Sequence, residues 1–317
     1  MADAEEVGTL GVVHLKRLWS RTLRGRAGLA PSTDELREWD RDDLVVMGLG
    51  LNLRETFDRL HHGAPAFAAF EAWVAQRAGD ALAPAHRARL NAALRGEPVA
   101  FFAEHGYVVV HDAAPQPQCA AAAQAIWSFL GADPDDPSTW YGGPQGHSIW
   151  VPLLRHPALW ANRRAPRIHG AFAQLWGRDD LWPNVDQVGF NPPERAGWPF
   201  PGPRLHWDVS LAPPIPLALK GLLYLVDVAA DQGAFTCVPG FHRRIDAWLA
   251  ALPSGADPRA QDLEALGPVP VAGRAGDLVI WHEALPHGSS PNRAALPRLV
   301  QYLGIVPSTR EVNPVWR

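Results

Sequence analysis

Two histidines and a carboxylate in the second half of this 317-residue chain have the residue types and spacing of a metal site. In the segment Leu205–Asp208, an extended backbone would turn His206 and Asp208 to one face and Trp207 to the other, because side chains alternate along a strand. His287 follows 81 residues later, after an apolar run and a turn. Its imidazole could complete a two-histidine, one-carboxylate face, the ligand set that holds non-haem Fe(II) and leaves other positions open.

A cationic side chain follows the second histidine of this set. Arg298 lies eleven residues after His287, at the start of the last predicted strand. If that strand runs alongside His287, the guanidinium can bind a carboxylate through two parallel hydrogen bonds within reach of the metal. These residues together predict a metal centre with an anion-binding residue beside it.

Short β-rich runs separated by turns must position these side chains. The runs are bounded by Gly, Pro, Asn and Asp, which favour turns. Regular helical patterns lie upstream of them, and this segregation favours a β-sandwich or jelly roll over a parallel βαβ sheet. The predicted strands are Tyr107–Val110, Val185–Phe190, Leu222–Val226, Phe235–Val238, Leu278–Trp281 and Leu299–Val306.

Helical patterning occupies the first part of the chain, and the composition changes near residue 100. A capping box at Ser32–Glu35 predicts the start of a helix that continues through Leu44. Further on, an apolar stripe with spacings of three and four predicts one buried helical face rather than an aromatic ligand box. The stripe consists of Phe67, Phe70, Trp73 and Val74. We therefore expect a helical region over residues 1–98, with no role assigned, and a β domain over residues 99–317.

Aromatic residues near a long loop are candidates for contact with a substrate. The segment Gly131–Gly146 is rich in proline and glycine and carries Trp140 and Tyr141. Long loops in compact domains are commonly functional lids or disordered. Together with Trp150 and Trp207, these residues could form an aromatic lid over a moderately apolar small molecule. Because the chain has 14 tryptophans, chance placement is the alternative.

Three sequence blocks make residues 187–306 resemble the phytanoyl-CoA dioxygenase family of Fe(II)- and 2-oxoglutarate-dependent oxygenases. The resemblance implies a mainly β fold with α-helices, whose core is a double-stranded β-helix of the jelly-roll or cupin-like type, preceded by the N-terminal helical region. The blocks are Leu205–Asp208, Gly233–Arg243, and His287–Arg293 with Pro297-Arg298.

The resemblance also implies a role for each residue of the predicted site. In the family, the His-x-Asp pair and a distal histidine bind iron, and these positions match His206, Asp208 and His287. The arginine eleven residues after the distal histidine binds the far carboxylate of 2-oxoglutarate, and a serine two residues after that histidine assists. These two positions match Arg298 and Ser289.

Further residues match the family less strictly. Gln187 and Asn191 are similar to a Gln-xxx-Asn strand that contacts the keto acid in some members, and their spacing places both side chains on one face. Tyr224 stands where an aromatic residue lines the 2-oxoglutarate pocket of relatives, or it is simply a core tyrosine. His242 belongs to a shared turn and is interpreted as structural. His282 rivals His287 as the distal ligand, but only His287 reproduces the family block in register.

The implied reaction is hydroxylation of a substrate C–H bond, which consumes O2 and 2-oxoglutarate and releases succinate and CO2. Halogenation is disfavoured, because Asp208 fills the place that related halogenases leave open for chloride. Desaturation, ring closure and epimerisation stay open, since they depend on how the substrate is placed. Two alternatives belong to other classes: a zinc hydrolase that uses the same three ligands, and a jelly-roll module that binds a ligand without catalysis.

Composition excludes several kinds of partner. The net charge of −4 gives no electrostatic case for nucleic acid or anionic membranes. No apolar stretch reaches the roughly 18 residues of a membrane span, and no basic segment followed by an apolar one suggests a secretory signal. Cys119 and Cys237 match neither a disulfide framework nor a zinc ribbon. We expect a cytoplasmic protein with a small-molecule substrate, free or linked to CoA or a carrier, and the oligomeric state stays open.

Overall fold

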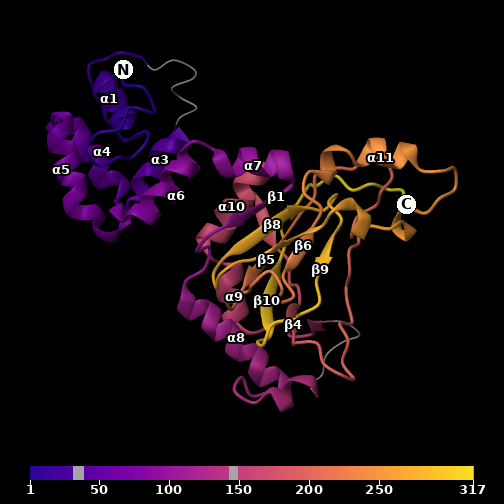
Figure 1. The fold of residues 1–317 in the computed structure, drawn as a ribbon. Coiled ribbons are helices and arrows are strands. Elements are labelled where there is room, and N and C mark those ends of the chain that lie inside the picture. The colour runs from indigo at the N-terminus through magenta and orange to yellow at the C-terminus, as the bar shows by residue number, and fades with distance from the viewer. Residues whose placement is uncertain (31–38, 143–148, 317) are drawn as a thin grey trace. The chain divides into compact units, whose positions relative to one another are not determined.

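Residues 1–30, 39–142 and 149–316 are described by the computed structural model, which Figure 1 shows as a ribbon. They divide into two units, Met1–Pro98 and Val99–Arg317. The predicted capping box at Ser32–Glu35 lies outside the described residues. No helix in these three ranges is long and apolar enough to cross a membrane.

The first unit is helical and has a hydrophobic core of its own. Phe70 and Val74 on α5 are fully buried in that core and Trp73 is 9% exposed, so the predicted apolar stripe is core packing. Asn52 caps α4 by accepting a hydrogen bond from the Glu55 backbone N–H, which would otherwise lack a partner at the helix start. The helices are α1 (Leu15–Arg26), α3 (Trp39–Gly48), α4 (Leu53–Gly63), α5 (Phe67–Ala78) and α6 (Pro84–Leu94).

The described residues of the second unit form three antiparallel sheets. A large six-stranded sheet has the strand order β1-β8-β5-β10-β4-β2, a three-stranded sheet has the order β7-β6-β9, and β11 pairs with β3. Antiparallel strands that form two sheets around one core are the jelly-roll arrangement predicted above. The strands are β1 (Tyr107–Val110), β2 (Trp150–Val151), β3 (Leu181–Pro183), β4 (Val188–Asn191), β5 (Leu219–Tyr224), β6 (Phe235–Cys237), β7 (Val269–Val271), β8 (Leu278–His282), β9 (His287–Ser289), β10 (Arg298–Leu303) and β11 (Ile305–Pro307).

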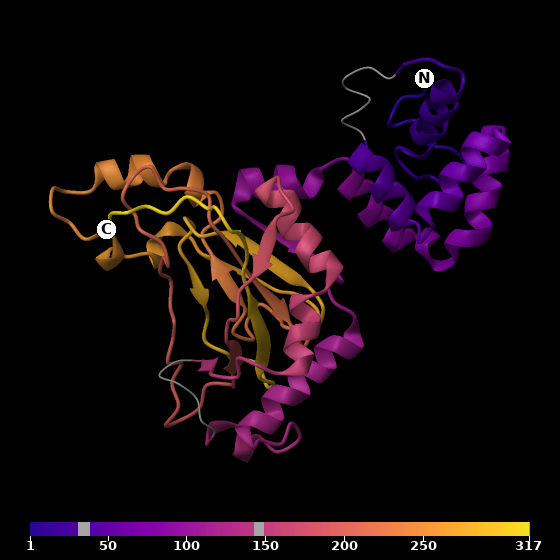
Figure 2. The same cartoon turned by 180° about the vertical axis from the view of Figure 1, so that it is seen from behind.

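Helices cover the outer face of the large sheet (Figure 1), and Figure 2 shows them from behind. Leu219 and Leu223 of β5 pack into a hydrophobic cluster with residues of α8, α9 and α10. The helices are α7 (Glu97–His105), α8 (Gln116–Leu130), α9 (Pro157–Arg163), α10 (Pro166–Trp176) and, at the other sheet, α11 (Ile245–Ala251).

The inner face of the large sheet looks toward the three-stranded sheet. Leu222 and Tyr224 alternate with the outward-facing residues of β5 and pack in a second cluster with Phe235 of β6 and Val271 of β7. This second cluster fills the space between the two sheets. Side chains that share the face of Leu222 and Tyr224 therefore point into the interior of the jelly roll.

The long loop predicted over Gly131–Gly146 contains a short 3-10 helix, Pro137–Tyr141. Its last part falls in residues 143–148, which lie outside the described residues.

Candidate active site

A backbone bridge joins the two predicted histidine ligands. His206 donates its N–H to the His287 carbonyl at 2.9 Å, and His287 donates back at 3.0 Å. The prediction of a regular strand through His206 and Asp208 is wrong: the pairing is confined to this isolated bridge, after which the chain bends. Asp208 nevertheless lies on the same side as His206, while Trp207 faces the core, as the alternation predicted.

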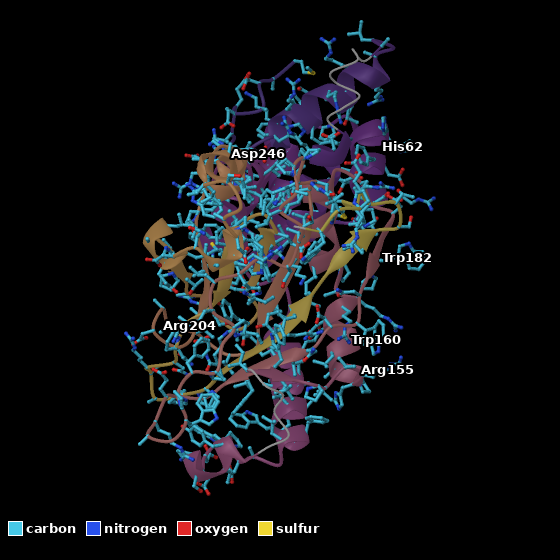
Figure 3. The ribbon with its side chains drawn as sticks, turned by 90° about the vertical axis from the view of Figure 1, so that its right-hand side faces the viewer. His62, Arg155, Trp160, Trp182, Arg204 and Asp246 are labelled. Atoms are coloured by element: carbon cyan, nitrogen blue, oxygen red, sulfur yellow. The ribbon has the colours of Figure 1, made fainter. Side chains whose placement is uncertain are left out.

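Both imidazole rings are oriented by backbone carbonyls. Nδ1 of His206 lies 2.7 Å from the carbonyl oxygen of Arg204, whose side chain is labelled at the surface in Figure 3. Nδ1 of His287 lies 2.9 Å from the carbonyl oxygen of Leu285. Because a carbonyl can only accept, each Nδ1 carries the hydrogen, and each ring, when neutral, turns the lone pair of Nε2 inward. Such outer partners fix the tautomer of metal-binding histidines.

The two Nε2 atoms converge on the carboxylate of Asp208. Nε2 of His206 lies 3.3 Å from Oδ1 of Asp208, and Nε2 of His287 lies 3.4 Å from Oδ2. One ligand atom from each of the three residues falls within 4.8 Å of the other two. Three electron-pair donors turned toward one point require a cation or protons between them, so this donor set fits a divalent metal.

The electrostatics of the three residues reflect this crowding. Burial acts to raise the pKa of Asp208, but hydrogen bonds with His206 and His287 hold that pKa well below its ordinary value. Burial acts to lower the pKa of His206, and the interaction with Asp208 outweighs it and raises the pKa. For His287, which is 3% exposed, burial dominates and lowers the pKa. Asp208 is thus held ionised and His287 neutral, the states in which both bind metals.

Arg298 is buried next to Ser289, and no acidic side chain forms an ion pair with it among the described residues. Its side chain is 1% exposed. Nη1 donates to Oγ of Ser289 at 2.9 Å, Nη2 lies 3.5 Å from the hydroxyl of Tyr302, and Nε has no hydrogen-bond partner among the described residues. A buried charge without a counter-ion is costly. The guanidinium therefore fits a ligand that brings a carboxylate.

A cavity of about 680 Å³, counting the space at its mouth, opens onto the three predicted metal ligands. Of the other predicted residues, Gln187, Trp150 and Ser289 also line it. The remaining lining residues with polar or aromatic side chains are Asp186, Lys220, Phe235, Trp281 and Tyr302.

Asn191, Tyr224 and Arg298 are not among the lining residues, although Arg298 bonds Ser289, which is. The amide of Asn191 donates to the Ser290 carbonyl at 3.1 Å. The hydroxyl of Tyr224 donates to the Val271 carbonyl at 2.6 Å and accepts from the Phe235 N–H. Burial raises the pKa of Tyr224 to about 12. Tyr224 therefore occupies the core between the sheets, which was the plainer of its two interpretations.

Three of the four predicted aromatic contacts point elsewhere. Trp207 is 3% exposed, donates its indole N–H to the Ala284 carbonyl and packs against Phe241. It lies on the side of the chain away from the cavity, so we withdraw it as a substrate contact.

Trp140 and Tyr141 are withdrawn for similar reasons. The indole N–H of Trp140 bonds the Asp133 carbonyl within its own loop, and its ring packs on Trp127 in the core. The hydroxyl of Tyr141 donates to the Pro193 carbonyl. Neither residue lines the cavity, which leaves Trp150 as the one residue of the predicted lid that does so within the described residues.

The rival histidine is placed outside the cluster. Nδ1 of His282 accepts a hydrogen bond from the Ala284 N–H, and its ring lies 5.4 Å from that of His242. Arg293, which also stands eleven residues after a histidine, is exposed. The structure thus brings His287, rather than His282, together with a buried arginine.

Sequence reasoning missed Lys220, which lines the cavity next to Asp208. Two signals were available. Lys220 and Lys16 are the only lysines of the chain, and Lys220 interrupts an otherwise apolar strand. Trp281 pairs with Lys220 on the neighbouring strand. The sequence pattern could not single it out, because an aromatic residue in a buried strand gives the same pattern whether it lines a cavity or packs in the core.

Comparisons with solved structures agree with this fold. The crystal structure of the non-haem α-ketoglutarate-dependent epimerase SnoN from nogalamycin biosynthesis aligns with a TM-score of 0.52 and 22% identity, over 70% of this chain and 86% of SnoN. Its complex with Fe3+, α-ketoglutarate and nogalamycin RO aligns with a TM-score of 0.52 and 21% identity, over 70% of this chain and 87% of that chain. At this level of identity, the likeness establishes the fold.

Sequence comparison identifies the family. A protein of Dictyostelium discoideum named as a phytanoyl-CoA dioxygenase is 23% identical over 274 residues, which cover 69% of this chain and 77% of the relative. The model of the family described as Phytanoyl-CoA dioxygenase (PhyH) matches residues 102–300. Because that match covers more than half of the chain, the protein belongs to the phytanoyl-CoA dioxygenase family of non-haem iron oxygenases that depend on 2-oxoglutarate.

Proposed function

We propose that this oxygenase hydroxylates a C–H bond of a small-molecule metabolite or natural-product intermediate. One observation carries the proposal: three inward-turned metal-ligand atoms lie within 4.8 Å of one another in a cavity that also reaches Ser289, the partner of the buried Arg298. In this proposal His206, Asp208 and His287 hold Fe(II), and Arg298 with Ser289 binds the far carboxylate of 2-oxoglutarate. Gln187 lines the cavity and is retained as a further contact to the keto acid.

The chain's own residues orient the reactants and limit the outcome. Fe(II) with 2-oxoglutarate and O2 supplies the oxidising power to break a substrate C–H bond, with release of succinate and CO2. Arg298 and Ser289 fix one end of the keto acid by charge and hydrogen bonding. Asp208 occupies the ligand position that a halide would need, which supports oxygen transfer over halogenation.

The cavity supports a small organic substrate. Trp150, Phe235 and Trp281 supply apolar walls, while Asp186 and Lys220 supply polar groups for orientation. We propose a substrate that is free or linked to CoA or a carrier. Because SnoN, which shares the fold, is named an epimerase, mass spectrometry must establish that the product gains one oxygen atom.

An anaerobic absorption titration tests the cofactor site. Metal-free protein receives Fe(II) and then 2-oxoglutarate, with Arg298→Ala as the comparison and Arg293→Ala, an exposed arginine nearby, as the control. We expect a visible charge-transfer band that requires both additions, and 2-oxoglutarate affinity at least about 30-fold weaker in Arg298→Ala, because a buried charge loses its partner. A folded wild-type protein without the band would contradict the proposal.

A further inference from the structure

Lys220 stands at the metal cluster on an interior face. It alternates with the outward-facing Leu219 on β5, so it shares the inner face with Leu222 and Tyr224. Across the ladder it pairs with Trp281 of β8, another lining residue of the cavity. Its position is fixed by the sheet rather than by a surface loop.

The ammonium of Lys220 lies 2.7 Å from Oδ2 of Asp208. This is the distance of a charge-assisted hydrogen bond. It is shorter than the distances of 3.3 and 3.4 Å between the carboxylate oxygens and the two imidazole Nε2 atoms. One oxygen of the ligand carboxylate therefore already has a strong partner supplied by the protein.

A buried acid holds Lys220 in this place. Oε1 of Glu283 lies 3.5 Å from Nζ of Lys220, and the Glu283 side chain is 7% exposed. Glu283 directly follows β8, and its backbone N–H bonds the Ala218 carbonyl. A buried carboxylate needs a cation beside it, so Glu283 restrains the ammonium of Lys220, which also bonds Asp208.

We propose that Lys220 is a positioning residue of the metal site: it holds one oxygen of Asp208 and leaves only the other to the metal. This inference rests on the proposed function, because it concerns the same Fe(II) and 2-oxoglutarate. A carboxylate restricted to one oxygen takes a single coordination position. Positions on the metal would then stay available for the keto acid and for O2.

The positive charge of Lys220 predicts opposite effects on the affinity for the metal and on the affinity for 2-oxoglutarate. Lys220 repels a bound dication and attracts the dianion of 2-oxoglutarate. Replacement of Lys220 by methionine therefore favours metal binding, both by removing the repulsion and by freeing the second oxygen of Asp208. The same change disfavours 2-oxoglutarate, since the attraction is lost and a position is taken by that oxygen.

The test measures the two affinities separately in the full-length protein. Calorimetry with Co(II) gives the metal affinity without turnover, and the anaerobic absorption band gives the affinity for 2-oxoglutarate in the presence of Fe(II). In Lys220→Met we expect Co(II) to bind as tightly as in the wild type or more tightly, and 2-oxoglutarate to bind about fivefold or more weakly. Lys220→Arg keeps the charge and should recover most of the 2-oxoglutarate affinity.

Lys16→Met is the matched control, because Lys16 is the only other lysine of the chain and pairs with Glu6 in the first unit. It should leave both affinities unchanged. Equal affinities in Lys220→Met and the wild type would overturn the inference. A parallel loss of both affinities in Lys220→Met would overturn it as well, since it would assign Lys220 a merely structural role. A wild-type protein without the band would instead refute the proposed function, and the inference with it.

Discussion

His206 and His287 hold each other through both backbone hydrogen bonds, at 2.9 and 3.0 Å, and their ring centroids lie 4.8 Å apart. Two residues far apart in the chain are thus joined at the backbone before their side chains meet. The ring orientations follow from carbonyls within two residues of each histidine. The spacing of the two Nε2 atoms is therefore a property of the backbone rather than of flexible side chains.

Gly288→Ala should disturb this bridge. A Cβ at Gly288 would lie 2.5 Å from the carbonyl oxygen of Arg204, a backbone atom that cannot move independently of His206. We expect a loss of about 1–3 kcal/mol in stability, together with weaker Co(II) binding measured by calorimetry. Gly170→Ala on α10 is the control, because a Cβ there meets no atom within 4 Å. Wild-type metal affinity in Gly288→Ala would show that the bridge does not set the ligand spacing.

Asp208→Ala should abolish succinate formation coupled to substrate. The variant loses the one anionic ligand of the cluster and leaves the charge of Lys220 beside the two histidines, so Fe(II) is repelled as well as less coordinated. The measurement is succinate release with and without substrate, with the exposed Asp246→Ala on α11 as the control. Turnover at the wild-type rate would remove Asp208 from the metal site.

Trp150→Ala and Trp207→Ala should affect different properties, the first substrate binding and the second stability. Trp150 lines the cavity, so its loss should raise KM for the substrate with a small change in stability. Trp207 is buried against Phe241 and Trp248, so its loss should cost about 3–5 kcal/mol in stability. Urea unfolding and KM per folded molecule separate the two effects. A raised KM in Trp207→Ala, with the stability unchanged, would restore Trp207 as a substrate contact.

His282 should make stability depend on pH. Burial, with the nearby His242 charge, lowers the pKa of His282 from 6.5 to about 4. The unfolded chain then binds more protons than the folded one across this window, so the free energy of unfolding falls as the pH falls from 6.5 towards 4. Between pH 7 and pH 5 the wild type should lose about 2 kcal/mol more than His282→Gln. Urea unfolding at both pH values checks this, and equal losses would contradict it.

The sequence was sufficient to predict most strands and the fold class. Tyr107–Val110 matches β1 at both ends, and Phe235–Val238 and Leu278–Trp281 differ from β6 and β8 by one residue. These runs are apolar, β-rich and bounded by turn residues, so the local signal and the final packing agree. The strands that the pattern did not predict have two or three residues, too few to establish a period of two.

The parts of the site that depend on contacts between distant residues were harder to predict from the sequence. The grouping of His206, Asp208 and His287 followed from residue type and spacing, but the backbone bridge that joins His206 to His287 is not visible in a tripeptide. Whether Trp207 faces a cavity or the core depends on what packs behind it, here Phe241 from another part of the chain. Lys220 becomes meaningful only when the ladder places β5 beside the cluster.

The His206–His287 bridge also bears on the order in which the site assembles. Because two of the three ligand side chains are set by backbone pairing, the folding of the second unit, rather than the arrival of the ion, builds the receptor. Metal binding should then order little further chain, and removal of the metal by a chelator should leave the arrangement of the ligands intact. Repeated cycles of removal and reloading should return the same centre without a refolding step.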